Sequence, residues 1–191
     1  MPRKLIIKAM SRIKNFVDWV IESLDYSCNF TRRERDHTRV KYSISGIQGV
    51  EVEMYVDFTE VHKMPGVWTR EYDTVDGEFT QLGTSNPKKI ISCISAATRD
   101  FMEKNQPLAL GIHHISMDNE KDFFSTSPNK RARINYPYLS SIPGYAVKVY
   151  NRMVAYDRSS YSVIYKPGKI DPLKVAQLLE PLQPIQQVFM R

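Results

Sequence analysis

Apolar side chains recur at helical spacing in the middle of the chain and predict a buried helix there. The apolar positions follow one another at intervals of four, three and four residues: Ile90, Ile94, Ala97 and Phe101. This spacing places them on one face of a helix. Pro87 suits the first helical position because its missing N–H would have no partner there, and Pro107 ends the helix. We therefore expect an amphipathic helix over about residues 87–105.

Alternation of apolar and polar residues predicts strands on both sides of this helix. The clearest case is residues 50–58, where every second side chain is apolar. Further strands are expected at residues 40–44, 67–72, 79–82, 108–115, 145–149, 153–156 and 161–165. The predicted fold is α+β, a mixed and largely antiparallel sheet packed by the central amphipathic helix, with N- and C-terminal helices in a single domain over residues 1–191.

Both ends of the chain carry helical patterns. The N-terminal pattern covers about residues 4–25, and its basic first half and acidic second half oppose the helix dipole. Such a helix fits a membrane surface or a partner's groove, with Arg12 and Trp19 as candidate contacts. The apolar stripe continues through the acidic half, which favours the alternative that the helix packs on the domain. The C-terminal helix is expected at about residues 171–181, starting at Asp171 and Pro172.

The cysteine count and the hydropathy narrow the class of protein. The sequence has 191 residues and two cysteines, Cys28 and Cys93, without metal-ligand spacing. Cys93 falls within the central helix and is expected to be a small core residue rather than a bridge partner. No stretch approaches the eighteen apolar residues of a membrane span. The cysteine count favours a reducing compartment.

The net charge of +6 raises the question of nucleic-acid binding. Six basic residues are candidate contacts, from a polar connection at residues 27–39 and from an expected helix at 128–136 that ends before Pro137: Arg32, Arg33, Arg35, Lys130, Arg131 and Arg133. Tyr136 and Tyr138 lie beside the second group, as in a single-strand binding platform. The alternatives are a self-neutralised exposed turn for the first group, and tyrosines that pack the helix on the sheet for the second. The latter is favoured for the tyrosines.

Histidines and carboxylates near strand ends are the candidates for chemistry. His113 and His114 are adjacent, so on a strand they point to opposite faces, which favours one buried and one surface histidine over a shared site. The carboxylates and histidine nearest another strand end, in a spacing that favours a plain polar loop over a metal site, are Asp57, Glu60 and His62. No phosphate-binding loop, nucleophile elbow, zinc-protease motif or dinucleotide fingerprint is present. We expect no catalytic residue, no metal and no cofactor.

The order of these motifs resembles that of small proteins encoded by tailed bacteriophages. The resemblance covers about residues 40–165 and rests on a turn at residues 83–86, the central helix, Gln106 and Pro107, an apolar strand, and Arg133 followed by tyrosine-rich strands. It implies a viral origin, a role in host takeover, defence evasion or replication, and the cytoplasm of a bacterial host as location.

The resulting expectation is a non-catalytic viral accessory protein that binds a host or phage protein. Trp68 and Tyr72 join Arg12 and Trp19 as candidate protein contacts. Two alternatives stay open: a basic nucleic-acid-binding protein, and a metal-dependent nuclease or phosphoesterase.

Overall fold

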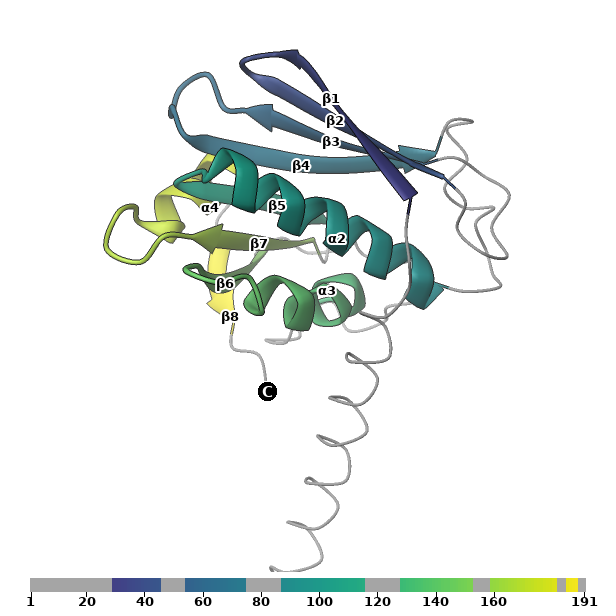
Figure 1. Cartoon of the computed structure of the whole chain (residues 1–191). Helices are drawn as coiled ribbons and strands as arrows, with labels where there is room; N and C mark the ends of the chain where they lie inside the picture. The colour runs from purple at the N-terminus through teal and green to yellow at the C-terminus, as the bar shows by residue number, and fades with distance from the viewer. Residues whose placement is uncertain are drawn as a thin grey trace, which may run out of the picture.

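The computed structural model describes residues 29–45, 54–74, 87–115, 128–152, 159–181 and 185–188. The elements within these ranges, in chain order, are β1 (Asn29–Asp36), β2 (Arg39–Ser45), β3 (Met54–Glu60), β4 (Val67–Thr74), α2 (Pro87–Asn105), β5 (Ala109–His114), α3 (Lys130–Ser140), β6 (Ala146–Arg152), β7 (Ser160–Tyr165), α4 (Pro172–Leu179) and β8 (Ile185–Val188) (Figure 1).

The described strands form one sheet of eight strands in the order β1-β2-β3-β4-β5-β7-β6-β8. The pairings between the described strands are antiparallel except that of β4 with β5, which is parallel and has α2 as its crossover connection. A parallel pair needs such a long connection because the chain must return to the starting edge of the sheet. The prediction of a mixed α+β fold with a largely antiparallel sheet is confirmed.

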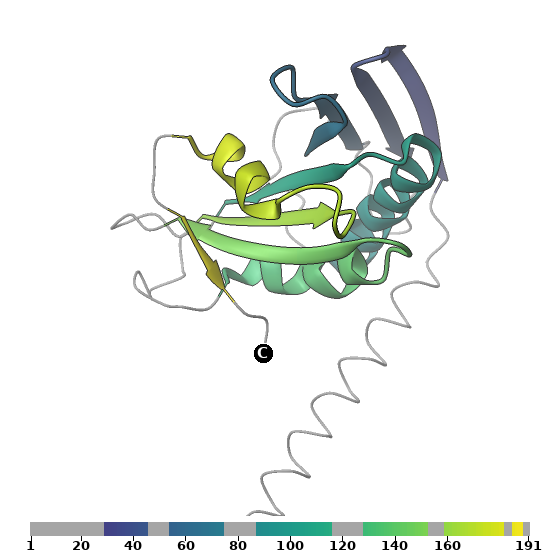
Figure 2. The ribbon, with the colours of Figure 1, turned by 90° about the vertical axis from the view of Figure 1, so that its left-hand side faces the viewer.

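Helices α2 and α3 lie on one face of the sheet, and α4 lies on the other (Figure 2). Alternate side chains of β2, β3 and β4 point toward α2 and are buried with it in one apolar cluster. At its centre the ring of Phe101 stacks on Phe58 at 4.0 Å and meets the Trp68 ring edge-on at 5.1 Å. The helix begins at Pro87 and ends at Asn105, as the sequence predicts.

The polar connection expected at residues 27–39 is wrong over most of its length, because Asn29–Asp36 forms β1 and pairs with β2 in an antiparallel hairpin. Its charged residues hide the alternation. Phe30 packs against the core, whereas the side chain two residues later is Arg32, and its polar tip forms hydrogen bonds and an ion pair. A long basic side chain can cover the core edge with its aliphatic stem.

The expected end of the helix before Pro137 is also wrong. Helix α3 continues through Pro137 to Ser140, and its N-cap is Asn129, whose side chain accepts from the Ala132 N–H at 2.9 Å. Pro137 removes one backbone hydrogen bond, but the turn that contains it buries Tyr138 and Leu139 almost completely.

Three other expectations concern the two ends of the chain and Cys93. Helix α4 lies within the range predicted for a C-terminal helix but is followed by β8, a strand that the sequence pattern did not predict. Cys93 is 1% exposed and disulfide-bonded, so the expectation that it is not a bridge partner is wrong. The N-terminal pattern at residues 4–25, with Arg12 and Trp19, lies outside the described residues, as does Cys28. Of the helices described, none has the length and apolar character needed to span a bilayer.

Candidate functional site

Strands β4 and β5 separate before they end. Their parallel register runs from Val67 and Ala109 to Arg70 and Ile112 and stops there. Beyond that point β4 continues to pair with β3 through residue 74, and β5 continues to pair with β7 through residue 114. We call residues 71–74 of β4 and 113–114 of β5 the strand fork. Within the described residues, no strand pairs with the sides of the fork that face each other.

The sheet face beneath α2 and α3 becomes polar toward the fork. The residues in register across β4, β5, β7 and β6 form three successive rows: Trp68, Leu110, Ile164 and Val147; then Arg70, Ile112, Ser162 and Val149; then, without β4, His114, Ser160 and Asn151. The first row is apolar, the second is mixed and the third is wholly polar. Burial of polar groups is unfavourable unless they are hydrogen-bonded, so each polar side chain here needs an explanation.

Arg70 is the polar residue whose burial is most unfavourable, because its guanidinium is charged and buried. The residue is 2% exposed, with Nη1 donating to Thr98 Oγ1 at 3.0 Å and Nη2 donating to Asn135 Oδ1 at 3.5 Å. Its Nε has no hydrogen-bond partner among the described residues. Burial lowers the pKa of Arg70 to about 10, so the side chain stays charged at neutral pH.

His114 lies one pleat farther along β5, on the same face. It is 1% exposed, and its Nε2 forms a hydrogen bond with Ser162 Oγ at 2.9 Å, whereas Nδ1 has no partner among the described residues. Burial, followed by the positive charges of Arg70, His113 and Arg131, holds the pKa of His114 well below 6.5. The imidazole is therefore neutral, and one of its two ring nitrogens is available to a ligand in either tautomer.

The start of α3 is fixed to the same rows. Asn129 donates from Nδ2 to the His114 carbonyl oxygen at 2.6 Å and from its backbone N–H to Ser160 Oγ at 2.9 Å. Ser160 donates in turn to Asn151 Oδ1 at 2.7 Å. This chain of buried hydrogen bonds holds α3 against β5, β6 and β7, which makes the surroundings of His114 rigid.

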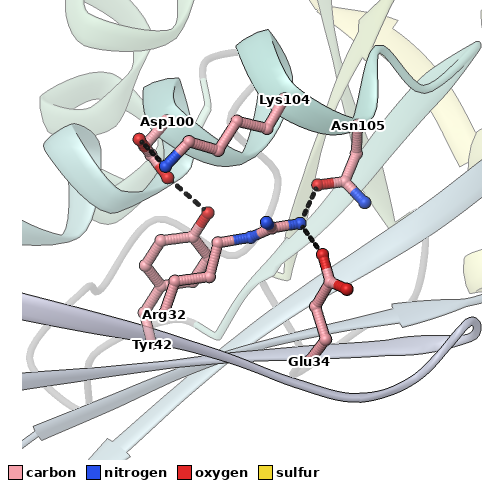
Figure 3. A network of polar contacts seen from close by, with 6 residues as sticks. All are labelled: Arg32, Glu34, Tyr42, Asp100, Lys104 and Asn105. Atoms are coloured by element: carbon pink, nitrogen blue, oxygen red, sulfur yellow. Dashed lines mark hydrogen bonds and ion pairs between the residues drawn. The ribbon is translucent and has the colours of Figure 1, made fainter.

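A second polar network lies away from the fork, between the β1–β2 hairpin and the C-terminal half of α2 (Figure 3). Arg32 donates to Asn105 Oδ1 at 2.9 Å and forms an ion pair with Glu34 at 2.5 Å. Tyr42, which is buried, donates its hydroxyl to Asp100 Oδ2 at 2.7 Å. All these groups bond one another, so we interpret the network as a structural tie.

The charges of Asp100 and Lys104 complete this network. Lys104 Nζ lies 2.9 Å from Asp100 Oδ1, one helical turn away. Burial alone would raise the pKa of Asp100, but the hydrogen bonds from Lys104 and Tyr42 outweigh it and lower the pKa below 3.8. The carboxylate is therefore ionised wherever the protein is handled near neutral pH.

The six basic residues predicted to contact nucleic acid do not share one surface. Arg33 and Arg35 line a polar hollow of about 680 Å³ on the open face of β1, β2 and β3, together with Lys41 and Tyr55. Arg32 points the other way, toward α2. The remaining three belong to α3, which lies with α2 on the opposite face of the sheet (Figure 2): Lys130, Arg131 and Arg133. Binding of nucleic acid by any of them stays a prediction.

The candidate protein contacts on β4 lie against the core. Trp68 is 6% exposed, and Tyr72 is half-buried and packs on the same apolar cluster. Glu60, from the candidate metal group, accepts the backbone N–H of Gly66 at 2.6 Å. Among the described residues, no three His, Cys, Asp or Glu side chains are placed to hold a metal ion.

The histidine pair follows the sequence interpretation, with His113 exposed and stacked on Tyr161 at 4.6 Å and His114 buried. Arg70 and Asn135 were missed as candidates. The available signal was the position of Arg70, which falls on the apolar phase of β4 between Trp68 and Tyr72. A charged residue on the core phase of a strand is the exception that calls for a partner.

No family model and no curated protein matches this chain. Solved structures with a similar arrangement include a mutant of spermidine N-acetyltransferase from Vibrio cholerae, with 8% identity, a TM-score of 0.40, and coverage of 72% of this chain and 71% of that chain. Another is ribosomal-protein-S5-alanine acetyltransferase from Vibrio fischeri, with 10% identity, a TM-score of 0.38, and coverage of 84% and 72%. At these values the likeness transfers neither substrate nor site residues.

These similar structures are enzymes, and that finding contradicts the expected non-catalytic viral accessory protein that acts by binding another protein. We withdraw that expectation. The resemblance to bacteriophage proteins is not tested by any comparison and stays a prediction.

Proposed function

We propose that this protein is an acyltransferase that binds a coenzyme A thioester at the strand fork. The observation that carries the proposal is the separation of β4 from β5 beyond Arg70 and Ile112, at the edge where the sheet face turns polar. In sheets with parallel strands, ligands bind outside the carboxyl ends of the strands, where neighbouring connections diverge.

The fork suits an extended ligand that contains amide groups. The sides of residues 71–74 and 113–114 that face each other have no strand partner among the described residues. Backbone N–H and C=O groups along such an edge pair with an extended chain in the manner of an added strand. The pantetheine arm of coenzyme A has two amides in a linear chain and is a ligand of this shape.

Helix α2 offers a complement to the phosphates of the same ligand. It has 19 residues and runs back from the carboxyl end of β4 toward the start of β5, so its N-terminus lies at the fork edge. Free N–H groups and the helix dipole favour an anion at this position, and the first turn has no acidic residue.

His114 is the side chain we assign to the acceptor amine. Transfer forms a carbon–nitrogen bond and breaks the carbon–sulfur bond of the thioester, and the amine must lose a proton while the thiolate gains one. A neutral imidazole nitrogen can accept a hydrogen bond from the amine and orient it, whereas the Arg70 guanidinium can only donate.

The test is binding and turnover with the full-length protein. Acetyl-coenzyme A is titrated calorimetrically, and thiol release is measured with a panel of amines. We expect binding in the micromolar range and a loss of turnover of about 100-fold in His114→Gln. His113→Gln, which changes the adjacent exposed ring on the opposite face, is the matched control and keeps wild-type turnover. Absence of coenzyme A binding at millimolar concentration would refute the proposal.

A further inference from the structure

Within the part of the chain that the structure describes, no negative charge matches the positive charge of Arg70. The groups it contacts are neutral: the Thr98 hydroxyl, the Asn135 amide oxygen and, 5.8 Å from Cζ, the ring of Tyr72. Among the described residues, no carboxylate influences its ionisation. A buried cation with only neutral partners is unfavourable, and removal of charges from water is repaid only by an opposite charge in good geometry.

The neighbouring partners are already occupied by other bonds, so they do not explain the position. Thr98 donates its hydroxyl to the Ile94 carbonyl oxygen at 2.7 Å, and Asn135 donates its amide to the Arg131 carbonyl oxygen at 2.9 Å. Both would remain hydrogen-bonded if Arg70 were absent. The structure therefore gains little from Arg70 that a neutral side chain would not supply.

Two buried nitrogen atoms belong to neighbouring strands at the base of the fork. Arg70 Nε and His114 Nδ1 are both buried without a partner among the described residues. Arg70 is in register with Ile112, and His114 lies two residues farther on the same face, which is on the order of 7 Å along the strand. The two side chains therefore share one face of the sheet at the place where β4 and β5 separate.

We propose that Arg70 binds a carboxylate of the acyl acceptor at the base of the strand fork, so that the acceptor is an amino acid or another amine that carries a carboxylate. This inference rests on the proposed acyltransferase function. One fixed positive charge balances one negative charge, which favours a carboxylate over a phosphate. The same charge disfavours a polyamine as acceptor, because like charges repel most strongly in a buried site.

The first experiment compares L-amino acids with their amides as acceptors, since each pair differs only in the negative charge. For wild type, we expect kcat/KM to be on the order of 100-fold higher for the acid. Arg70→Gln removes the charge, keeps a polar side chain beside Thr98 and Asn135, and is expected to bring this ratio close to one. Coenzyme A binding, measured by calorimetry, is expected to be unchanged in this variant.

A second variant remains informative if Arg70→Gln does not fold. Asn135→Asp is nearly isosteric and places a carboxylate where the amide oxygen now lies, 3.5 Å from Arg70 Nη2. This internal carboxylate competes with that of the substrate, so the preference for the acid is expected to disappear. Wild type that prefers the amide or spermidine, or a variant that keeps the preference for the acid, would overturn the inference.

Thermal unfolding in sodium acetate separates this inference from the proposed function, because it needs no turnover. We expect acetate, relative to sodium chloride at equal ionic strength, to raise the Tm of wild type and to leave that of Asn135→Asp unchanged. If acetate acts this way while coenzyme A fails to bind, the anion site stands and the acyltransferase proposal fails. If acetate changes the Tm of wild type and of Asn135→Asp equally, or changes neither, the proposed anion site is refuted.

Discussion

Helix α4 docks on β5 through the absence of a side chain at Gly111, and this contact allows a quantitative prediction. A Cβ atom at Gly111 would lie 2.5 Å from Leu179 Cδ1, 3.0 Å from Cδ2 and 3.2 Å from Cγ. Carbon atoms in contact are normally about 3.5–4.0 Å apart. Gly111→Ala must therefore displace Leu179 by roughly 1 Å or push the end of α4 away from the sheet.

The expected cost follows from two opposing terms. Overpacking of a well-filled contact costs about 1–3 kcal/mol, whereas the loss of glycine's freedom in the unfolded chain returns about 0.4–1 kcal/mol. We expect Gly111→Ala to lower the free energy of unfolding by about 1–2 kcal/mol. Leu179→Ala alone should cost a similar amount, because the side chain is half-buried against the cluster under α4.

A double-mutant cycle distinguishes the contact from other causes. If the clash with Leu179 is the reason, Gly111→Ala should be neutral or slightly stabilising in the Leu179→Ala background, with a coupling energy of about 1–3 kcal/mol. Urea unfolding followed by tryptophan fluorescence measures each variant, with unchanged m-values as the condition for comparison. Additive effects of the two substitutions would refute this account of how α4 docks.

Three further predictions concern buried polar groups. Tyr42→Phe should lower the free energy of unfolding by about 1 kcal/mol at pH 7, because it removes the hydrogen bond to Asp100. The bond requires the Asp100 carboxylate, so the difference between the two proteins should vanish as the pH falls through the lowered pKa of Asp100. A difference that persists at pH 2 would contradict this. His114 takes up a proton in the unfolded chain near pH 6.5 but not in the folded one. The free energy of unfolding should therefore fall by about 1.4 kcal/mol for each pH unit below pH 6.5. His114→Gln should reduce this slope when the free energy of unfolding is measured by denaturant titration. Burial lowers the pKa of Arg70 to about 10, which means that its charge is unfavourable in the folded protein. Asn135→Asp should recover about 1 kcal/mol of this cost and raise the Tm by about 2–4 °C. A lower Tm would show that burial of the new carboxylate costs more than the ion pair contributes.

Periodicity in the sequence was sufficient for the central helix and for most strands of the sheet, because burial of one face dominates those segments. Pro87 and Asn105 bound α2 as expected. Strand β1 was not predicted because Arg32, which points toward α2, breaks the alternation of apolar and polar residues. Its guanidinium donates a hydrogen bond to Asn105, which is 73 residues later in the sequence.

The site was harder to predict than the fold because its members are ordinary residues brought together by register. Asn135 and Thr98 carry no motif, and their role depends on the approach of α3 and α2 to β4. Arg70 was visible as a charge on the apolar phase of a strand, but the parting of β4 from β5 is a property of pairing, which a single sequence does not encode locally.

The short seam between β4 and β5 also bears on the order in which the chain acquires its structure. Strands β1 to β4 pair with their neighbours in sequence, and so do β6 and β7, so both groups form from local contacts. The two groups are joined through β5: its four pairs with β4 close a loop of about forty residues from Trp68 to Leu110, and its pairs with β7 close one of more than fifty from Leu110 to Ile164. Contacts that close long loops form late because their entropic cost precedes their gain. The region assigned to ligand binding thus lies where the strand pairings that form late meet the hairpins that form early.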